Sequence, residues 1–171
     1  MALRSFSHIG ICVSDLDRST RFYRDVLGFA ELFTVDFDDG LPPTMERPNA
    51  FTSRMLARDD LRIELLRWHD DDTEGDGERR PMNRLGMTHL CFRVDDAAEL
   101  FDIAERCHGA AWRDTMMTLP VAEVFAEPMV AAYITDPDGT RIECISNSPD
   151  LSVALQTAIA DYFDAPGDSP T

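Results

Sequence analysis

The sequence predicts an α+β fold made of two consecutive βαβββ modules, because the chain repeats itself and each repeat shows the same order of hydrophobic patterns. A spacing of 81 residues aligns, without a gap, His8 with His89, Val13 with Val94, Asp15 with Asp96, and Gly28 with Gly109. Further along, Arg62-Ile63-Glu64 aligns with Arg141-Ile142-Glu143 at a spacing of 79 residues. The two copies therefore differ by only two residues of net loop length.

Each repeat opens with an alternating, strand-like segment, at residues 5–13 and 87–94. A helix is expected next, because Asp15 and Asp96 suit helix N-termini, and Gly28 and Gly109 supply the left-handed residue that ends a helix. Three more strands are predicted in each copy, at residues 29–37, 51–57 and 61–68 in the first and 110–115, 129–135 and 140–146 in the second.

We assign residues 1–171 to a single domain, with a first module at 5–69, an acidic linker at 70–86 and a second module at 87–147. A chain of this size buries roughly 70% of its unfolded surface, which is enough for one shared core. A C-terminal helix is predicted at residues 149–163, where Leu151, Leu155, Ile159 and Phe163 recur four residues apart.

The composition is that of a globular protein with a strong acidic excess. Its 16 basic and 32 acidic residues give a net charge of −16. Phosphate backbones and anionic lipids repel such a chain, so we expect neither nucleic acid nor a membrane as a partner. No apolar run approaches the ~20 residues that cross a bilayer, and the N-terminus lacks the pattern of a signal peptide. We expect a cytoplasmic protein with reduced, buried cysteines at Cys12, Cys91, Cys107 and Cys144.

The repeat also supplies candidate metal ligands, because in each copy a histidine opens the first strand and a glutamate lies within the last. These four residues are His8, Glu64, His89 and Glu143. If the concave faces of the two modules meet about a pseudo-twofold axis, the four side chains converge on one cavity. Two imidazoles and two carboxylates without sulfur suit a divalent ion such as Ni, Zn, Co, Mn or Fe, with two positions left for water or substrate.

The sequence around the two glutamates supports this site. Glu64 and Glu143 each lie among large apolar residues, and a buried carboxylate needs a partner or a metal. The alternative is that each glutamate pairs with the arginine two residues earlier, Arg62 or Arg141, on a solvent-facing strand. The two remaining histidines lie in the linker and at a helix end, where we expect surface residues rather than ligands.

Several segments resemble the vicinal oxygen chelate superfamily: residues 7–16, 21–23 and 26–29, then residues 88–96 and 136–143. The resemblance extends from Phe6 to Ser146 and implies two paired βαβββ modules that form a curved mixed sheet around a central metal. The superfamily includes glyoxalase I, methylmalonyl-CoA epimerase, extradiol dioxygenases, fosfomycin-modifying transferases and bleomycin-binding resistance proteins. Glyoxalase I is similar in its ligand set, which corresponds to His8, Glu64, His89 and Glu143.

The resemblance implies a metal-dependent lyase or isomerase acting on a small-molecule substrate. In such an enzyme the metal binds two substrate oxygens, acidifies the neighbouring C–H and stabilises the enediolate. Glu143 is the first choice as the base that moves the proton, and Glu64 is the second. No redox cofactor is needed. Homodimers are common in the family resembled, so the site lies either within one chain or across a dimer.

Two alternatives to this function stay open. One is an extradiol-type ring-cleaving dioxygenase using Fe, although a fourth protein ligand would block oxygen from the metal. The other is a non-catalytic resistance protein that holds an apolar drug between the modules. The residues that would line such a cavity also suit an ordinary core, and they are Phe51, Met55, Trp68, Met116, Met117 and Phe125.

Overall fold

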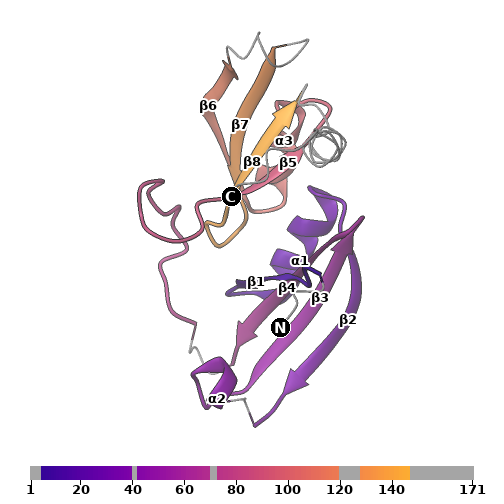
Figure 1. Cartoon of the computed structure of the whole chain (residues 1–171), viewed down its shortest axis with the longest axis vertical. Coiled ribbons are helices and arrows are strands. Elements are labelled where there is room, and N and C mark those ends of the chain that lie inside the picture. Colours follow the sequence, from indigo (N-terminus) through magenta and orange to yellow (C-terminus); the bar gives the residue numbers. More distant parts are fainter. Residues whose placement is uncertain (1–4, 40–41, 70–72, 120–127, 147–171) are drawn as a thin grey trace, which may run out of the picture.

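The computed structural model describes residues 5–39, 42–69, 73–119 and 128–146, which form two four-stranded mixed sheets (Figure 1). The first sheet has the order β1-β4-β3-β2 and contains β1 (Ile9–Cys12), β2 (Ala30–Phe37), β3 (Phe51–Arg58) and β4 (Leu61–Trp68). The second sheet has the matching order β5-β8-β7-β6 and contains β5 (Leu90–Arg93), β6 (Ala110–Leu119), β7 (Met129–Thr135) and β8 (Arg141–Ser146). The predicted α+β fold of two βαβββ modules is confirmed.

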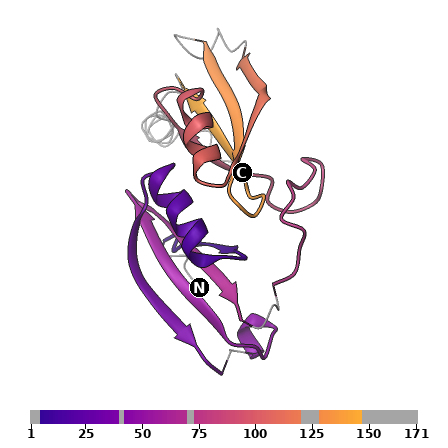
Figure 2. The ribbon, with the colours of Figure 1, turned by 180° about the vertical axis from the view of Figure 1, so that it is seen from behind.

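One helix covers one face of each sheet: α1 (Leu16–Asp25) on the first and α3 (Glu99–Arg106) on the second. Figure 2 shows both helices in front of their sheets. A short helix α2 (Pro42–Met45), which the hydrophobic pattern does not predict, lies between β2 and β3. The predicted C-terminal helix at 149–163 lies outside the described residues. No helix in the described part of the chain is long and apolar enough to cross a membrane.

Helix α1 begins and ends where the sequence predicts. The Asp15 side chain accepts a hydrogen bond of 2.9 Å from the backbone N–H of Arg18, which satisfies a donor at the helix N-terminus. Gly28 has a φ of 71° and allows the chain to turn back towards β2. The inner face of the helix buries Phe22 and Tyr23 completely against the sheet.

Helix α3 ends differently from the prediction. The left-handed residue after this helix is His108, with a φ of 66°, so the expectation that Gly109 supplies it is wrong. Gly109 instead allows a close approach between the modules. A Cβ atom there would lie 2.4 Å from the ring of Phe22 and 2.3 Å from the carbonyl oxygen of Thr135.

One buried apolar cluster joins the two modules. It contains the helix-facing side chains of both sheets and the inner faces of α1 and α3. Its large members include Phe22, Tyr23, Phe29, Leu56, Ile63, Ile134 and Ile142. Rings from the two modules also meet edge to face, with 6.1 Å between the centroids of Phe29 and Phe92. Because burial of apolar surface is the dominant favourable term in folding, the modules are fixed to each other through their helix-covered sides.

Polar contacts between the β7–β8 turn and α1 strengthen this module boundary. The Tyr23 hydroxyl donates a 2.9 Å hydrogen bond to Asp136, which is only 2% exposed. Asp138 accepts hydrogen bonds from the Ser14 backbone N–H at 3.1 Å and from the Arg18 guanidinium at 2.8 Å. Burial raises the pKa of Asp136, and burial followed by the charge of Asp136 raises the pKa of Tyr23 well above its ordinary value.

Gly109→Ala is expected to lower the free energy of unfolding by about 1–3 kcal/mol, because the added methyl group would overlap Phe22 and the Thr135 carbonyl. Gly10→Ala is the matched control, since a Cβ at Gly10 would lie 3.7 Å from Leu66, which is an ordinary contact. Urea unfolding of both variants measures the difference. Equal free energies for the two would contradict the close approach at Gly109.

Tyr23→Phe is expected to lower the free energy of unfolding by about 1–3 kcal/mol at neutral pH, because buried Asp136 loses a donor. The Tyr23 pKa is higher in the folded than in the unfolded chain. The stabilisation that protonated Tyr23 contributes is therefore fully present below its pKa in the unfolded chain, about 10. This stabilisation is lost as the pH rises through the higher pKa of Tyr23 in the folded chain. Urea unfolding across alkaline pH should show a steeper loss for the wild type, and parallel profiles would contradict the contact.

Candidate metal centre

The first pair of candidate ligands lies on the face of the first sheet opposite α1. His8 directly precedes β1, which runs parallel to β4 with Gly10 beside Glu64, so both side chains point from one face. His8 Nε2 lies 3.2 Å from Glu64 Oε2. Ser53 Oγ donates a 2.5 Å hydrogen bond to the other carboxylate oxygen, and Ser7 Oγ lies 3.0 Å from His8 Nδ1. A hydroxyl group therefore holds each of the two side chains.

The second pair has the same arrangement on the second sheet. Strand β5 runs parallel to β8 with Cys91 beside Glu143, and His89 lies just before β5. His89 Nε2 lies 3.1 Å from Glu143 Oε2. Tyr133 Oη donates a 2.9 Å hydrogen bond to Glu143 Oε1, and Thr88 Oγ1 lies 2.9 Å from His89 Nδ1. Again each side chain is held by a hydroxyl group.

The two pairs have the same hydrogen-bonding arrangement. In both, the Nδ1 contact with a neighbouring hydroxyl orients the imidazole so that Nε2 points at the carboxylate. Metal-ligating histidines typically use their second nitrogen in this way, and ligating carboxylates are hydrogen-bonded in turn. Each pair thus presents one nitrogen and one oxygen donor, and a neighbouring hydroxyl group already contacts each of the two side chains.

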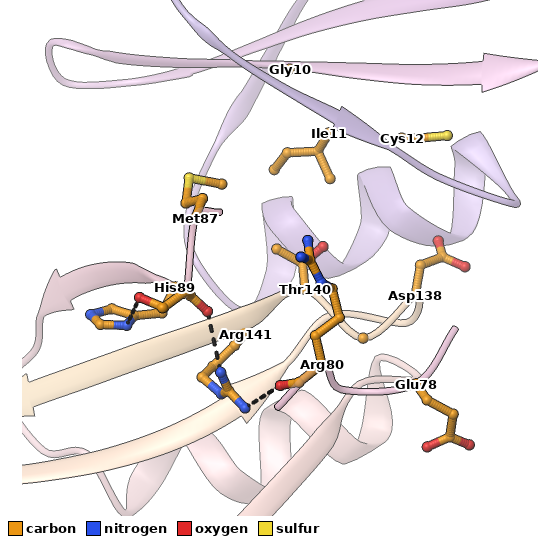
Figure 3. Close-up of a pocket in the computed structure, with 12 residues that line it drawn as sticks. Gly10, Ile11, Cys12, Glu78, Arg80, Met87, His89, Asp138, Thr140 and Arg141 are labelled. Atoms are coloured by element: carbon orange, nitrogen blue, oxygen red, sulfur yellow. Dashed lines mark hydrogen bonds between the residues drawn. The ribbon is translucent and has the colours of Figure 1, made fainter. Parts of the chain in front are cut away.

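Neighbouring arginines do not neutralise the two glutamates. Arg141 donates instead to the backbone carbonyl of Arg80 at 2.6 Å (Figure 3). It also donates to the backbone carbonyl of Thr88 at 3.3 Å. Within the residues that the structure describes, Arg62 forms no ion pair with Glu64. The alternative that each carboxylate pairs with its neighbouring arginine is therefore wrong.

Both pairs are partly exposed and surrounded by neutral donors. The side chains of Glu64 and Glu143 are 22% and 15% exposed, and those of their histidines are 37% and 29% exposed. Burial, followed by the charge of Glu143, raises the pKa of the Cys91 thiol to about 12. Burial, followed by the hydrogen bond to Glu143, raises the pKa of Tyr133 to about 12. Both groups are therefore neutral at physiological pH.

Among the described residues, the four candidate ligands form two separate pairs rather than one cluster within the chain. In the described ranges, no group of three or more His, Cys, Asp or Glu side chains is placed to hold a metal ion. The modules meet through their helix-covered faces, whereas each pair lies on the opposite face of its sheet. The chain thus carries a first half-site, His8 with Glu64, and a second half-site, His89 with Glu143.

A cavity of about 240 Å³ between the modules does not gather the ligands either. The cavity is lined by strand β1, the linker, the segment before β5, and the β7–β8 turn with the first residue of β8. His89 alone of the four candidates borders it (Figure 3). Its walls include the charged side chains of Glu78, Arg80 and Asp138. This cavity is therefore not the apolar drug site of the second alternative.

The residues suggested for such a drug site lie in different surroundings. Phe51 is buried, with its ring centroid 4.9 Å from that of Trp68. On β6, Met116 is 47% exposed and Met117 is 53% exposed. Phe125 lies outside the described residues.

Sequence reasoning missed four hydroxyl groups that hold the half-sites. Two of them, Ser7 and Thr88, precede the histidines at equivalent positions of the repeat, which is a signal that the sequence carries. The other two, Ser53 and Tyr133, differ in position relative to their glutamates, so the repeat does not reveal them. Tyr133 lies directly opposite its glutamate, where the first module has Met55.

The expectation that the cysteines are reduced and buried is only partly right. All four are free thiols. Cys144 is buried and Cys107 is intermediate, but Cys12 and Cys91 are exposed. The two exposed thiols lie in the first strands of the modules, beside Leu66 and Glu143 respectively, on the half-site faces.

Comparison with known protein sequences identifies the family of this chain. The sequence profile of the Glyoxalase/Bleomycin resistance protein/Dioxygenase superfamily matches residues 5–144, which include both half-sites. The chain belongs to this superfamily. A lactoylglutathione lyase of Neisseria meningitidis serogroup A is 34% identical over 158 residues, covering 88% of this chain and 97% of the relative. A lactoylglutathione lyase of Haemophilus influenzae is 30% identical over 141 residues, covering 82% and 90%.

Solved structures of the glyoxalase superfamily share the fold. A glyoxalase family protein from Bacillus cereus superimposes with a TM-score of 0.69 at 20% sequence identity. The match covers 85% of this chain and 95% of that one. The two-module architecture is thus common to this chain and a protein with low sequence identity.

In the metal-free protein, Glu143→Gln is expected to speed the alkylation of Cys91 by iodoacetamide at mildly alkaline pH. The Glu143 charge is one cause of the raised Cys91 pKa, so its removal increases the thiolate fraction while the partial desolvation of this thiol persists. Glu64→Gln is the control, because Glu64 belongs to the other half-site. Mass spectrometry of the Cys91 peptide gives the rates. An unchanged rate in Glu143→Gln would contradict the contact.

Proposed function

We propose that this chain is a glyoxalase I-type lyase that isomerises a hemithioacetal by proton transfer next to a metal-chelated oxygen. The matched half-sites carry this proposal, since equivalent strands present one imidazole and one carboxylate twice. The names of the two lactoylglutathione lyases support the reaction. Lactoylglutathione is a thioester, and the hemithioacetal of glutathione and an α-keto aldehyde is its isomer. The conversion therefore moves one proton between neighbouring carbons and one proton between the oxygens that these carbons carry, with no net oxidation.

The half-site residues suit a divalent cation. Two imidazole nitrogens and two carboxylate oxygens without sulfur form a set that Ni, Zn, Co, Mn and Fe accept. In each half-site the nitrogen and oxygen donors are 3.2 Å and 3.1 Å apart, close enough to share one ion. When bound, the cation would supply the positive charge that stabilises negative charge on the substrate oxygens.

The complete four-ligand site requires two chains in this proposal. The half-sites lie on different sheets, and the modules of one chain are joined through the opposite sides of those sheets. The sheet faces that carry the two half-sites also expose apolar side chains. Phe33 is 52% exposed, Val35 is 39% exposed and Met117 is 53% exposed. A second copy would cover these residues. In a twofold dimer, the first half-site of each chain then meets the second half-site of its partner.

Glu143 is the base in the proposed reaction, and Glu64 is the second candidate. The base takes the proton from the carbon bonded to sulfur and returns it to the neighbouring carbon. The Glu143 side chain is the less exposed of the two, at 15% against 22%. The lower exposure leaves less bulk water in contact with the carboxylate that carries the proton, and its neighbours Tyr133 and Cys91 are neutral, so they add no competing negative charge.

Chains with His8→Ala and chains with His89→Ala are each expected to lose metal and isomerase activity when purified separately. Co-expressed, they are expected to recover about one quarter of the wild-type sites. Random pairing makes half of the dimers mixed, and each mixed dimer has one intact site out of two. Metal analysis and solvent-deuterium incorporation into the product of a glutathione hemithioacetal measure the recovery.

The control is a chain that carries both changes, because its dimers with either single variant contain no intact site. Different affinity tags on the two variants, captured one after the other, verify that mixed dimers form. If mixed dimers form but recover neither metal nor activity, the two-chain site is wrong. If the wild-type protein takes up none of the five metals and exchanges no deuterium, the lyase function is wrong as well.

A further inference from the structure

The two half-sites have the same ligands, but different side chains face their glutamates from the neighbouring strand. Strand pairing places Tyr133 of β7 directly opposite Glu143. The equivalent residue opposite Glu64 is Met55 of β3, whose thioether donates no hydrogen bond. Ser53, two residues earlier on β3, supplies the hydroxyl that reaches Glu64. The second half-site therefore differs from the first in having an aromatic donor opposite its carboxylate.

Tyr133 contacts both candidate ligands of the second half-site. Its hydroxyl donates a 2.9 Å hydrogen bond to Glu143 Oε1. Its ring meets the His89 ring edge to face, with 6.0 Å between the centroids and 77° between the planes. This is a favourable arrangement of two aromatic rings. Because Glu143 Oε2 lies 3.1 Å from His89 Nε2, each of these three side chains contacts the other two.

The backbone of Tyr133 is held at an irregular part of strand β6. The register of β6 against β7 shifts between Trp112 and Met117. Within this stretch, the Thr115 hydroxyl accepts a 3.1 Å hydrogen bond from the Tyr133 backbone N–H and donates one to the Trp112 carbonyl. Irregularities of this kind re-aim side chains and are common beside active sites. Thr115 therefore fixes the strand position from which Tyr133 reaches Glu143.

Glu143 is also contacted from the strand on its other side. Cys91 of β5 lies beside Glu143, and a hydrogen bond with Glu143 contributes to the raised pKa of this thiol. The residue beside Glu64 in the first module is Gly10, which has no side chain. Strand β8 lies between β5 and β7, so both neighbouring strands hold the Glu143 carboxylate.

These contacts give the two oxygens of Glu143 different surroundings. Oε1 accepts the hydrogen bond from Tyr133, whereas Oε2 faces His89 Nε2. A carboxylate that takes a proton from one carbon and returns it to the next must keep its position, because a displacement of about 1 Å can cost about 100-fold in rate. With Oε1 fixed, Oε2 can take and return the proton while the carboxylate stays in place.

We propose that Tyr133 is the positioning residue that makes Glu143, rather than Glu64, the carboxylate that carries the proton. Tyr133 acts through Glu143 and His89 and does not touch the reacting carbons. Glu64, which Ser53 holds from one neighbouring strand, serves as a ligand. The inference rests on the proposed lyase function, and it adds the structural reason for which two equivalent glutamates have different roles.

Tyr133→Phe tests this role, because it removes the hydroxyl and keeps the ring beside His89. In protein saturated with its metal, kcat for a glutathione hemithioacetal is expected to fall about 10- to 100-fold, while KM changes little. The Glu143 carboxylate is then less well fixed for proton transfer, whereas substrate binding persists. Steady-state kinetics measure both constants. A raised KM with an unchanged kcat would contradict the positioning role.

Tyr23→Phe is the matched control. It removes the same hydroxyl from a carboxylate, that of Asp136, but at a buried position between the modules. It should lower the free energy of unfolding and leave kcat unchanged, which separates a loss of stability from a loss of positioning. Ser53→Ala, which removes the hydroxyl from Glu64, should lower kcat less than Tyr133→Phe does. An equal or larger loss of kcat in either variant would overturn the proposal.

Thr115 provides a test that leaves the side chains of the half-site unchanged. Thr115→Val removes the acceptor for the Tyr133 backbone N–H and should reproduce part of the loss in kcat. Thr115→Ser keeps a hydroxyl and should retain more of the activity than Thr115→Val. Equal kcat values in these two variants would contradict the role of Thr115 in holding Tyr133.

Titration of the metal-free protein with Co²⁺ gives a readout that does not depend on turnover. Tyr133→Phe is expected to bind Co²⁺ about 10-fold more weakly, because Glu143 loses a hydrogen-bond donor, whereas Tyr23→Phe should bind it as the wild type does. A wild-type kcat in Tyr133→Phe would refute the inference and leave the lyase function standing. If the Co²⁺-loaded wild type turns over no hemithioacetal but Tyr133→Phe binds Co²⁺ more weakly, the lyase function is refuted and only the hold of Tyr133 on Glu143 stands.

Discussion

The apolar cluster between the helix-covered faces of the two modules is the constraint on which the rest of the structure depends. Phe22 lies against Gly109 of the other module, and the Tyr23 hydroxyl reaches buried Asp136 across the boundary. Because the modules meet on this side, the opposite faces of both sheets carry the histidines and glutamates. The position of the candidate ligands is therefore a consequence of where the core forms.

The two modules present the same ligands in different surroundings. Glu64 is held by a serine from a neighbouring strand, whereas Glu143 is held by a tyrosine directly opposite and lies beside Cys91. In the second module, Arg79 of the linker stacks on the ring of Trp112. The described part of the first module has no such contact with the linker. The proposed division of labour follows from this asymmetry: both modules hold the cation, and the second also moves the proton.

The repeat predicted the modules well because strands with one buried face must alternate apolar and polar residues, and that pattern is legible in a single sequence. The bounds of β4 and β7 agree with the prediction. Strand β6 extends to Leu119, beyond the predicted end, because an irregular register between Trp112 and Met117 interrupts the alternation. Gly109 was assigned the wrong role, since a close contact with a distant residue leaves no local signal.

The sequence by itself determined the fold class, the two His–Glu pairs and their equivalent positions in the two modules, because these depend on local periodicity and on strand pairing within one module. Only the tertiary structure decided that the two pairs stay apart among the described residues of one chain and that Tyr133 holds Glu143. These features depend on packing between segments far apart in the chain. No pattern along a single sequence records which faces of two modules will meet.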